Sequence, residues 1–381
     1  MNAPDCIVVG AGIHGLCTAF WLARAGRRVT LLEQYEPAHG RGSSHGGTRI
    51  TRSSYDTPEF VRLATSAHRL GWPTLEAAMG QALRRPTPGI FFGPDEGLFA
   101  AYLRTTQGSG ADIERIEAAA ARRRFPLLRF ADEDRVLVDH TAAVLLAATT
   151  MQALRDWLLA AGATFHWRTR ALHVRAAGDL TIVATDHGDL AAHRVVVAAG
   201  PWGRGLPCAD EPAAQTTVLR QHVGYFAVEA QPGACAPGNF PVWAHIGATA
   251  ADFTYGLPDV DDSGLKAAAH RTEGAADDPD VDEESDPRPL LQLARERFAV
   301  PVRGLLRSER CLYTMVPDHR LEVARGRTVP GLVRITACSG HAFKFGPELG
   351  RRAAALAIDE AVNSDCFGIE PTGAARNNDM P

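Results

Sequence analysis

The sequence predicts an α/β protein, α+β overall, in which a Rossmann-like unit is joined to a second unit with a largely antiparallel sheet. Three observations support this prediction. A strand, a glycine-rich turn, a helix and a second strand follow one another from Cys6 to Gln34. Another buried strand, ending in small residues, runs from Arg194 to Gly203. The 381 residues of the chain are enough for two units of ordinary size.

The composition is that of a globular protein, with 45% hydrophobic and 22% charged residues. A net charge of −4 gives no basic footprint for nucleic acid. The first residues lack the basic stretch of a signal peptide, and the longest apolar run, Thr141 to Thr149, is too short to cross a bilayer. The seven cysteines form no CxxC pair, so we expect neither a disulfide framework nor a metal site. A cytoplasmic protein without nucleic-acid or membrane partners is expected.

The N-terminal segment has the pattern of a dinucleotide-binding turn. An apolar strand, Cys6 to Val9, is followed by Gly10, Gly12 and Gly15 at GxGxxG spacing and then by an apolar helix. These glycines permit a tight turn, a close approach to a pyrophosphate and close helix packing, and the phosphates would lie at the helix N-terminus. The alternative is a tight strand–helix turn without a ligand. The predicted cofactor residues here are Gly10, Ala11, Gly12, Ile13, His14, Gly15, Glu33 and Gln34.

Two later segments favour FAD over NAD as the dinucleotide. Glu33 ends the second strand, where it can accept from the ribose hydroxyls and where an NADP phosphate would be repelled. The polar loop that follows contains Gly40, Gly42, Gly46 and Gly47, and such a loop can lie along an extended cofactor. The small residues after the strand that starts at Arg194 would approach the middle of the dinucleotide. The further predicted FAD contacts are Gly42, Ser43, Ser44, Ala171, Ala199, Gly200 and Trp202.

Four blocks of sequence together resemble the monomeric sarcosine oxidase and N-methyltryptophan oxidase family, within the D-amino-acid-oxidase-type flavoproteins. They are the GxGxxG unit, "GSSHGGTRITR" (42–52), "YGLPDVDDSGLKAAAH" (255–270) and "CLYTMVPDH…SGHAFKF" (311–345). The resemblance implies that His45, Thr48 and Arg49 lie against the flavin ring. It also implies that Arg52 binds the substrate carboxylate, a role that suits the two parallel donors of a guanidinium. The alternative for both arginines is a phosphate contact or a surface ion pair.

Lysine is the rare cation of this chain: of 40 basic residues, 38 are Arg and two are Lys. The resemblance gives Lys344 a share of the carboxylate and places Lys266 beside the flavin N5, where a fixed ammonium promotes reaction with oxygen. A compact ammonium differs from a planar guanidinium in shape and in its ability to change pKa. The alternative is that either lysine is an ordinary surface residue. Both lie inside family motifs, which favours a chemical role.

The loop before Lys344 is expected to run close to the flavin and to offer backbone N–H groups to it. The family has glycine where this chain has Ala342, so the added methyl group is expected to reshape the pocket. The predicted cofactor contacts of this loop are Gly340, His341, Ala342, Phe343 and Lys344.

The resemblance implies further pocket residues. His270 and Tyr255 are expected to line the substrate pocket, with a structural histidine and a core aromatic as alternatives. Cys311 is where the family attaches the flavin 8α-methyl group through a thioether, and we expect Arg307 and Arg310 to lower the pKa of its thiol. A non-covalent flavin or a packing role for the cysteine remains the alternative. Tyr313 is expected to line the same site.

The FAD-binding domain is predicted to be discontinuous, spanning 1–85, 140–215 and 315–381, with a substrate domain at 86–139 and 216–314. The acidic stretch 273–287 has few apolar residues and is interpreted as a solvated loop before a helix that begins near Arg288. The walls of the substrate pocket are expected from 218–226 and 240–248.

Together these observations predict a monomeric FAD-dependent amine oxidase. Its substrate would be a secondary or cyclic amino acid, such as sarcosine, another N-methyl amino acid or an imino acid. The products would be an imine and, from O2, hydrogen peroxide. Three alternatives remain: a dehydrogenase that passes electrons to another acceptor, a biosynthetic oxidase that desaturates a ring, and a non-catalytic flavoprotein that binds a carboxylate ligand.

Overall fold

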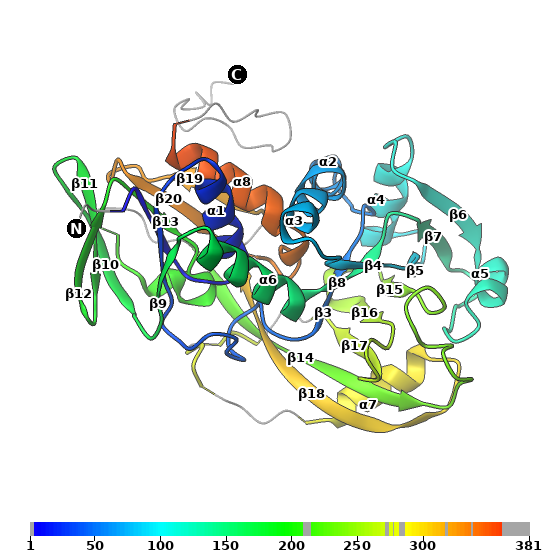
Figure 1. Cartoon of the computed structure of the whole chain (residues 1–381). Helices are drawn as coiled ribbons and strands as arrows, with labels where there is room; N and C mark the ends of the chain where they lie inside the picture. Colours follow the sequence, from blue (N-terminus) through cyan, green and yellow to red (C-terminus); the bar gives the residue numbers. More distant parts are fainter. Residues whose placement is uncertain are drawn as a thin grey trace, which may run out of the picture.

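The structure is a computed structural model. It describes residues 4–208, 215–270, 274–276, 278–281, 286–316, 319–336 and 338–359. Two large sheets organise this part of the chain (Figure 1).

The first sheet has six strands in the order β19-β20-β13-β1-β2-β9. Strand β1 (Cys6–Val9) is parallel to β2 (Val29–Leu32) on one side and to β13 (Arg194–Val197) on the other. All four residues of β1 are buried, as expected for a central strand covered on both faces. The remaining strands are β9 (Thr164–His166), β19 (Glu322–Arg325) and β20 (Leu332–Thr336), of which β19 is antiparallel to its neighbour.

Helices cover one face of this sheet, and a small sheet covers the other. The helices are α1 (Ile13–Arg24), α6 (Ala147–Ala160) and α8 (Gly346–Ala357), whose apolar side chains share one core with β1. A Cβ atom on Gly350 would lie 2.6 Å from the Cys17 backbone, so glycine allows α8 to pack directly on α1. The small sheet consists of β10 (Ala171–Ala177), β11 (Leu180–Thr185) and β12 (Gly188–Ala192).

The second large sheet has eight strands in the order β18-β14-β17-β16-β15-β5-β7-β6, and every neighbouring pair except β15–β5 is antiparallel. The largely antiparallel sheet that the sequence predicts is therefore confirmed. Its strands are β5 (Gly89–Gly93), β6 (Ile113–Glu117), β7 (Arg135–Asp139), β14 (Thr217–Val228), β15 (Val242–Ile246), β16 (Phe253–Leu257), β17 (Leu265–Ala269) and β18 (Val302–Met315). Helices α4 (Gly97–Thr106), α5 (Ala118–Arg124) and α7 (Arg288–Arg297) accompany it.

A three-stranded sheet lies between the two large ones (Figure 1). It consists of β3 (Thr48–Thr51), β4 (Arg84–Pro86) and β8 (Ala143–Leu146), with α2 (Pro58–Ser66), a π-helical turn (Ala67–Gly71) and α3 (Trp72–Met79) nearby. Short 3-10 helices occur at Gly200–Gly205, Ala250–Asp252 and Phe343–Phe345. No helix in the described ranges is long and apolar enough to cross a membrane. Apart from Met315 at the end of β18, the strands of the two large sheets fall within the two sets of residues that the sequence predicts as domains, but that division itself stays a prediction.

Candidate active site

Two adjoining cavities hold almost all of the predicted site residues. The first, of about 620 Å³, lies along β1 and the N-terminus of α1, and the second, of about 340 Å³, lies beside β3 and β17. Ser43, His45, Cys338 and Phe343 line both cavities, so the two spaces meet at these side chains. An extended ligand could therefore begin in the first cavity and reach the second.

The glycine turn at the end of β1 leaves no room for side chains. Gly10 has a φ of 98°, and a Cβ atom there would lie 2.5 Å from the Ala198 carbonyl oxygen. A Cβ atom on Gly15 would lie 1.9 Å from the Gly10 carbonyl oxygen. The free N-terminus of α1 follows, with no acidic side chain in its first turn, and Ile13 N–H donates to Ser44 Oγ at 3.1 Å. This arrangement fits a bound pyrophosphate.

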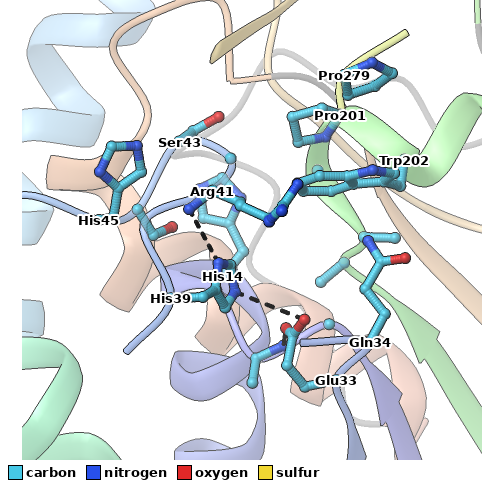
Figure 2. A pocket seen from close by; sticks show the side chains of 18 of the residues that line it. His14, Glu33, Gln34, His39, Arg41, Ser43, His45, Pro201, Trp202 and Pro279 are labelled. Carbon is cyan, nitrogen blue, oxygen red and sulfur yellow. Dashed lines mark hydrogen bonds and ion pairs between the residues drawn. The ribbon is translucent and has the colours of Figure 1, made fainter. Parts of the chain in front are cut away.

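Glu33 occupies the position expected for a ribose acceptor. Its side chain is 8% exposed and accepts from Ala11 N–H at 2.9 Å and from Tyr35 N–H at 3.1 Å. His39 Nε2 lies 3.6 Å from the same carboxylate. These bonds orient the carboxylate at the wall of the first cavity (Figure 2), and its remaining lone pairs could accept from hydroxyl groups.

The predicted cofactor residues divide between the two cavities. Gly15 lies behind the turn and lines neither cavity. The first cavity is lined by Gly10, Ala11, Gly12, Ile13, His14, Glu33, Gln34, Gly42, Ser43, Ser44, Ala171, Ala199, Gly200, Trp202 and Phe343. The second is lined by Ser43, His45, Thr48, Arg49, Cys311, Tyr313, Gly340, His341, Ala342, Phe343 and Lys344. The glycine turn, the N-terminus of α1 and the buried acid would hold the pyrophosphate and a ribose of FAD.

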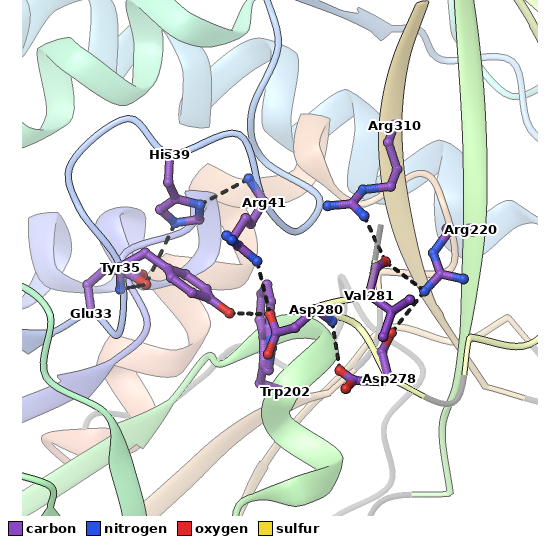
Figure 3. Close-up of polar contacts among 10 residues, drawn as sticks. All are labelled: Glu33, Tyr35, His39, Arg41, Trp202, Arg220, Asp278, Asp280, Val281 and Arg310. Atoms are coloured by element: carbon purple, nitrogen blue, oxygen red, sulfur yellow. Dashed lines mark hydrogen bonds and ion pairs between the residues drawn. The ribbon is translucent and has the colours of Figure 1, made fainter. Parts of the chain in front are cut away.

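Part of the acidic stretch 273–287, which the sequence predicts as a solvated loop, lines the first cavity. The Asp280 carboxylate accepts from the Tyr35 hydroxyl and from Trp202 Nε1, the latter at 3.3 Å, and Arg41 Nη1 lies 3.5 Å from it (Figure 3). Arg220 donates to the Asp278 and Val281 carbonyls at 2.9 and 3.0 Å. Asp278, Asp280 and Val281 are exposed, as expected for a solvated loop, but their partners come from distant parts of the sequence.

Arg52 is a buried cation at the wall of the second cavity. It is 6% exposed and follows β3. Its guanidinium donates to the Ser54 carbonyl and, at 3.1 Å, to the Tyr102 hydroxyl, and it lies 4.1 Å from the Tyr55 ring centroid. Within the described ranges Arg52 makes no ion pair with an acidic side chain. Its position is that of a cation held ready for an anionic ligand.

Lys344 lies in the same cavity, 7% exposed, in the 3-10 turn before α8. Trp72 Nε1 donates to its carbonyl at 2.9 Å, which fixes the turn, and its Nζ donates to the His341 carbonyl at 3.3 Å. Burial holds the pKa of Lys344 well below its ordinary value, and the nearby charge of Arg52 acts in the same direction. An anion bound between the two cations would oppose both effects.

Lys266 and Arg49 both donate to the carbonyl of Thr48, the first residue of β3. Arg49 donates to the carbonyls of Thr48, Ser43 and His45 at 2.8, 2.8 and 2.6 Å, so it braces the loop before β3. Lys266, on β17 and 4% exposed, donates to the Thr48 carbonyl at 3.3 Å. Burial, reinforced by Arg49, lowers the pKa of Lys266 to about 7.

Neutral polar side chains make up another wall of the second cavity. The hydroxyls of Tyr255 and Tyr313 lie 3.2 Å apart, and the His270 ring centroid lies 5.3 Å from that of Tyr313. His270 directly follows β17, as the predicted hairpin requires, and burial lowers its pKa to about 4. Burial likewise lowers the pKa of His45 to about 4. Both imidazoles are therefore neutral at pH 7.

Cys311 lies on β18 opposite Gln221 of β14 and lines the second cavity. Burial raises the pKa of its thiol, and Arg49 and Lys266 are the charges that most oppose this. The sequence assigns that role to Arg307 and Arg310, which is wrong because burial raises the pKa of the thiol and the cations that act against this rise are Arg49 and Lys266.

Several residues of the site were not predicted from the sequence. In the second cavity these are Tyr55, Phe60, Phe91, Leu98, Tyr102, Phe253, Glu309 and His319. In the first they include His39, Arg41, Trp167, Arg204 and Asp280. Tyr55 stands three residues after Arg52 and could have been found by extending that block. Val223 and Ala244, from the two segments expected to form pocket walls, do line the second cavity.

Comparisons with known proteins relate the whole chain to FAD-dependent enzymes. The model of the family described as FAD dependent oxidoreductase matches residues 5–356. The chain is 29% identical over 364 residues to monomeric sarcosine oxidase of Streptomyces avermitilis, covering 93% of each chain. It is 26% identical over 378 residues to N-methyl-L-tryptophan oxidase of Salmonella dublin, covering 95% of this chain and 96% of that one.

A solved structure has the same fold. The open form of NikD, an unusual amino acid oxidase essential for nikkomycin biosynthesis, is 22% identical, with a TM-score of 0.83 over 96% of this chain and 97% of that chain. The resemblance predicted from the four sequence blocks is confirmed. Because the family model spans most of its length, the chain belongs to the DAO family of FAD-dependent oxidoreductases.

Proposed function

We propose that this enzyme oxidises the C–N bond of a secondary or cyclic amino acid to an imine and reduces O2 to hydrogen peroxide. The observation that carries the proposal is that two cations, Arg52 and Lys344, lie in the same cavity. Both cations are buried in one cavity without an acidic ion-pair partner in the described ranges, and Lys266 lies in the same cavity. A carboxylate ligand would satisfy both charges, because an unpaired buried cation is costly.

The residues of the second cavity suit this reaction. Arg52 and Lys344 would anchor the carboxylate and so hold the α-carbon at a fixed place. The neutral wall of Tyr255, Tyr313 and His270 would receive the amine without forming an ion pair, which favours a substrate nitrogen that can lose its proton. When bound, FAD would supply the two-electron chemistry. Lys266 would stabilise the negative charge that develops on oxygen as it is reduced.

We further propose that FAD is attached through Cys311, that the enzyme is a monomer, and that the two sets of residues predicted from the sequence are its domains. Attachment is supported by the position of Cys311 on the cavity wall, where burial raises the pKa of its thiol but the charges of Arg49 and Lys266 oppose this rise.

The test is a substrate screen by peroxide release with sarcosine, other N-methyl amino acids, proline and pipecolate, combined with Arg52→Gln. The variant should raise KM for an active substrate about 100-fold, since a charge-assisted bidentate contact contributes about 1.5–3 kcal/mol. An amine without the carboxylate should be affected far less. Arg303→Gln is the control, because it removes an exposed ion pair with Glu229.

Three results would contradict the proposal. Unchanged KM in Arg52→Gln would remove the carboxylate site. Substrates that bleach the flavin anaerobically, followed by slow reoxidation in air, would indicate a dehydrogenase instead. A flavin that no amine bleaches would indicate a non-catalytic flavoprotein.

A further inference from the structure

Three side chains form one line across three neighbouring strands. Tyr225 of β14 is directly opposite Lys266 of β17 on one side and Arg307 of β18 on the other. Directly opposed residues of antiparallel strands project from the same face of a sheet. The Tyr225 ring accordingly lies between the two cations, with its centroid 3.6 Å from the Arg307 guanidinium carbon and 5.2 Å from Lys266 Nζ.

Glu309 lies two residues along β18 and so projects from the same face as Arg307. The Tyr225 hydroxyl donates to Glu309 Oε2 at 2.9 Å, and Arg307 forms an ion pair with the same carboxylate. A Cβ atom on Gly46 would lie 3.0 Å from Oε2, so the loop before β3 closes against it. The carboxylate is therefore fixed from three sides at the wall of the second cavity.

Glu309 is the carboxylate that acts on Lys266, and the other charged groups named around this lysine include the cations Arg49 and Arg307. Burial and the charge of Arg49 lower the pKa of Lys266, whereas Glu309 has the largest effect among the groups that raise it. Burial raises the pKa of Glu309, but Arg307 and Lys266 outweigh this and hold it below its ordinary value, so the carboxylate is charged. Four segments present titratable or charged groups to Lys266. They are His45 from the loop before β3, Arg49 from β3, Tyr225 from β14, and Arg307, Glu309 and Cys311 from β18.

We propose that Glu309 is a positioning residue for oxygen reduction: held by Tyr225 and Arg307, it keeps the Lys266 ammonium charged without pairing with it. This rests on the proposed oxygen chemistry. In the described ranges no ion pair joins the two side chains, so the ammonium remains available to a developing anion. A carboxylate in direct contact would stabilise the charge but also neutralise its field.

The scarcity of lysine makes a direct test possible. Holoenzyme labelled with [ε-¹³C]lysine has two side-chain signals, because the chain has two lysines, and Lys266→Arg assigns them. In Glu309→Gln the titration midpoint of Lys266 should move to lower pH by about one unit, as expected for the loss of a nearby opposite charge. Tyr225→Phe, which keeps the carboxylate, should move it in the same direction by less. An unchanged midpoint in Glu309→Gln would overturn the proposal.

Oxygen reactivity is the second measurement. The holoenzyme is reduced by light and an electron donor without amine substrate, then mixed with oxygen at a series of pH values. The pH profile of reoxidation in Glu309→Gln should move with the Lys266 midpoint, with a several-fold slower rate at pH 7.5. Glu229→Gln is the matched control, since Glu229 directly follows β14 and also pairs with an arginine of β18, Arg303, but this pair is exposed.

The outcomes separate the two proposals. If wild-type enzyme is not reoxidised by oxygen, the proposed function fails, while the lysine titration still decides whether Glu309 acts on Lys266. If the midpoint moves and the reoxidation profile does not, the role of Glu309 in oxygen reduction is wrong. If Glu309→Gln does not fold, Tyr225→Phe provides the same comparison.

Discussion

Burial gives each of the two lysines a property that arginine could not supply. The pKa of a guanidinium stays above about 12 in proteins, whereas an ammonium responds to burial and to neighbouring charges. Lys266 and Lys344 are both buried, and the pKa of each lies below its ordinary value. Their charges can therefore change with ligand or pH, while the pKa of Arg52 is raised and its guanidinium remains charged.

This difference predicts a pH dependence for oxygen reactivity. The charged form of Lys266 is present below its pKa of about 7 and is lost as the pH rises through that value. Reoxidation of the reduced enzyme should accordingly slow above pH 7, as measured by stopped-flow absorbance. Lys266→Met should be slower by about 100-fold at pH 6, as for the loss of one fixed stabilising group, and should show no such step. A wild-type rate that increases with pH would contradict this assignment.

Cys311 provides a second prediction at this scale. If it carries the flavin, acid-precipitated wild-type protein should remain yellow after washing, and Cys311→Ala should give a colourless pellet with free flavin in the supernatant. Cys338→Ala is a suitable control because Cys338 lines both cavities but does not lie on β18. A colourless wild-type pellet would exclude the thioether.

Residues with a motif could be predicted from the sequence, and residues without one could not. Gly10, Glu33, Arg52 and Lys266 stand in spaced patterns with a chemical meaning. Tyr102 and Glu309 reach the same cavity only because α4 and β18 pack beside it, and such long-range contacts leave no local periodicity in the sequence.

At the scale of elements, the local sequence pattern predicted whether a segment forms a helix or a strand. It did not predict which strands lie next to one another in a sheet. The βαβ start and the helix near Arg288 follow from apolar periodicity and end signals. The position of β20 beside β13, and of β14 between β17 and β18, depends on pairings between distant residues. Acidic composition predicted the exposure of 278–281, but it does not show which basic or aromatic partners the fold supplies.

The segment 278–281 predicts an effect on cofactor retention. Asp280→Asn weakens the bonds from Tyr35, Trp202 and Arg41 at the mouth of the first cavity. In the Cys311→Ala background, FAD release should accelerate about fivefold, as expected for a partly exposed polar contact of about 1 kcal/mol. Release can be followed by flavin fluorescence. Asp189→Asn, which removes an exposed pair with Arg175, should leave the rate unchanged, and equal rates in both variants would refute the role of Asp280.

At the scale of the whole molecule, the first cavity is lined by residues of both large sheets and of the loops that join them. Ala11 follows β1 of the six-stranded sheet, and Val218 belongs to β14 of the eight-stranded sheet. A ligand that fills this cavity contacts both layers, so its binding free energy contributes to the stability of the complete fold rather than to one part of it.

FAD should consequently raise the unfolding temperature of the whole chain. In Cys311→Ala, free FAD at 100 times its Kd should add about 2.7 kcal/mol to the free energy of unfolding, with one transition in calorimetry. Riboflavin lacks the pyrophosphate and adenosine, so it should stabilise the variant much less at the same concentration. Equal stabilisation by the two compounds would show that the glycine turn contributes nothing.

The burial of both lysines has a practical consequence for handling the enzyme. Reagents that couple to primary amines usually decorate a protein at many surface lysines and attach it to a support in random orientations. Here both side-chain amines are inside the second cavity, so no lysine on the surface can react. Coupling would be directed to the α-amino group, and immobilised molecules would share one orientation with the cavities untouched.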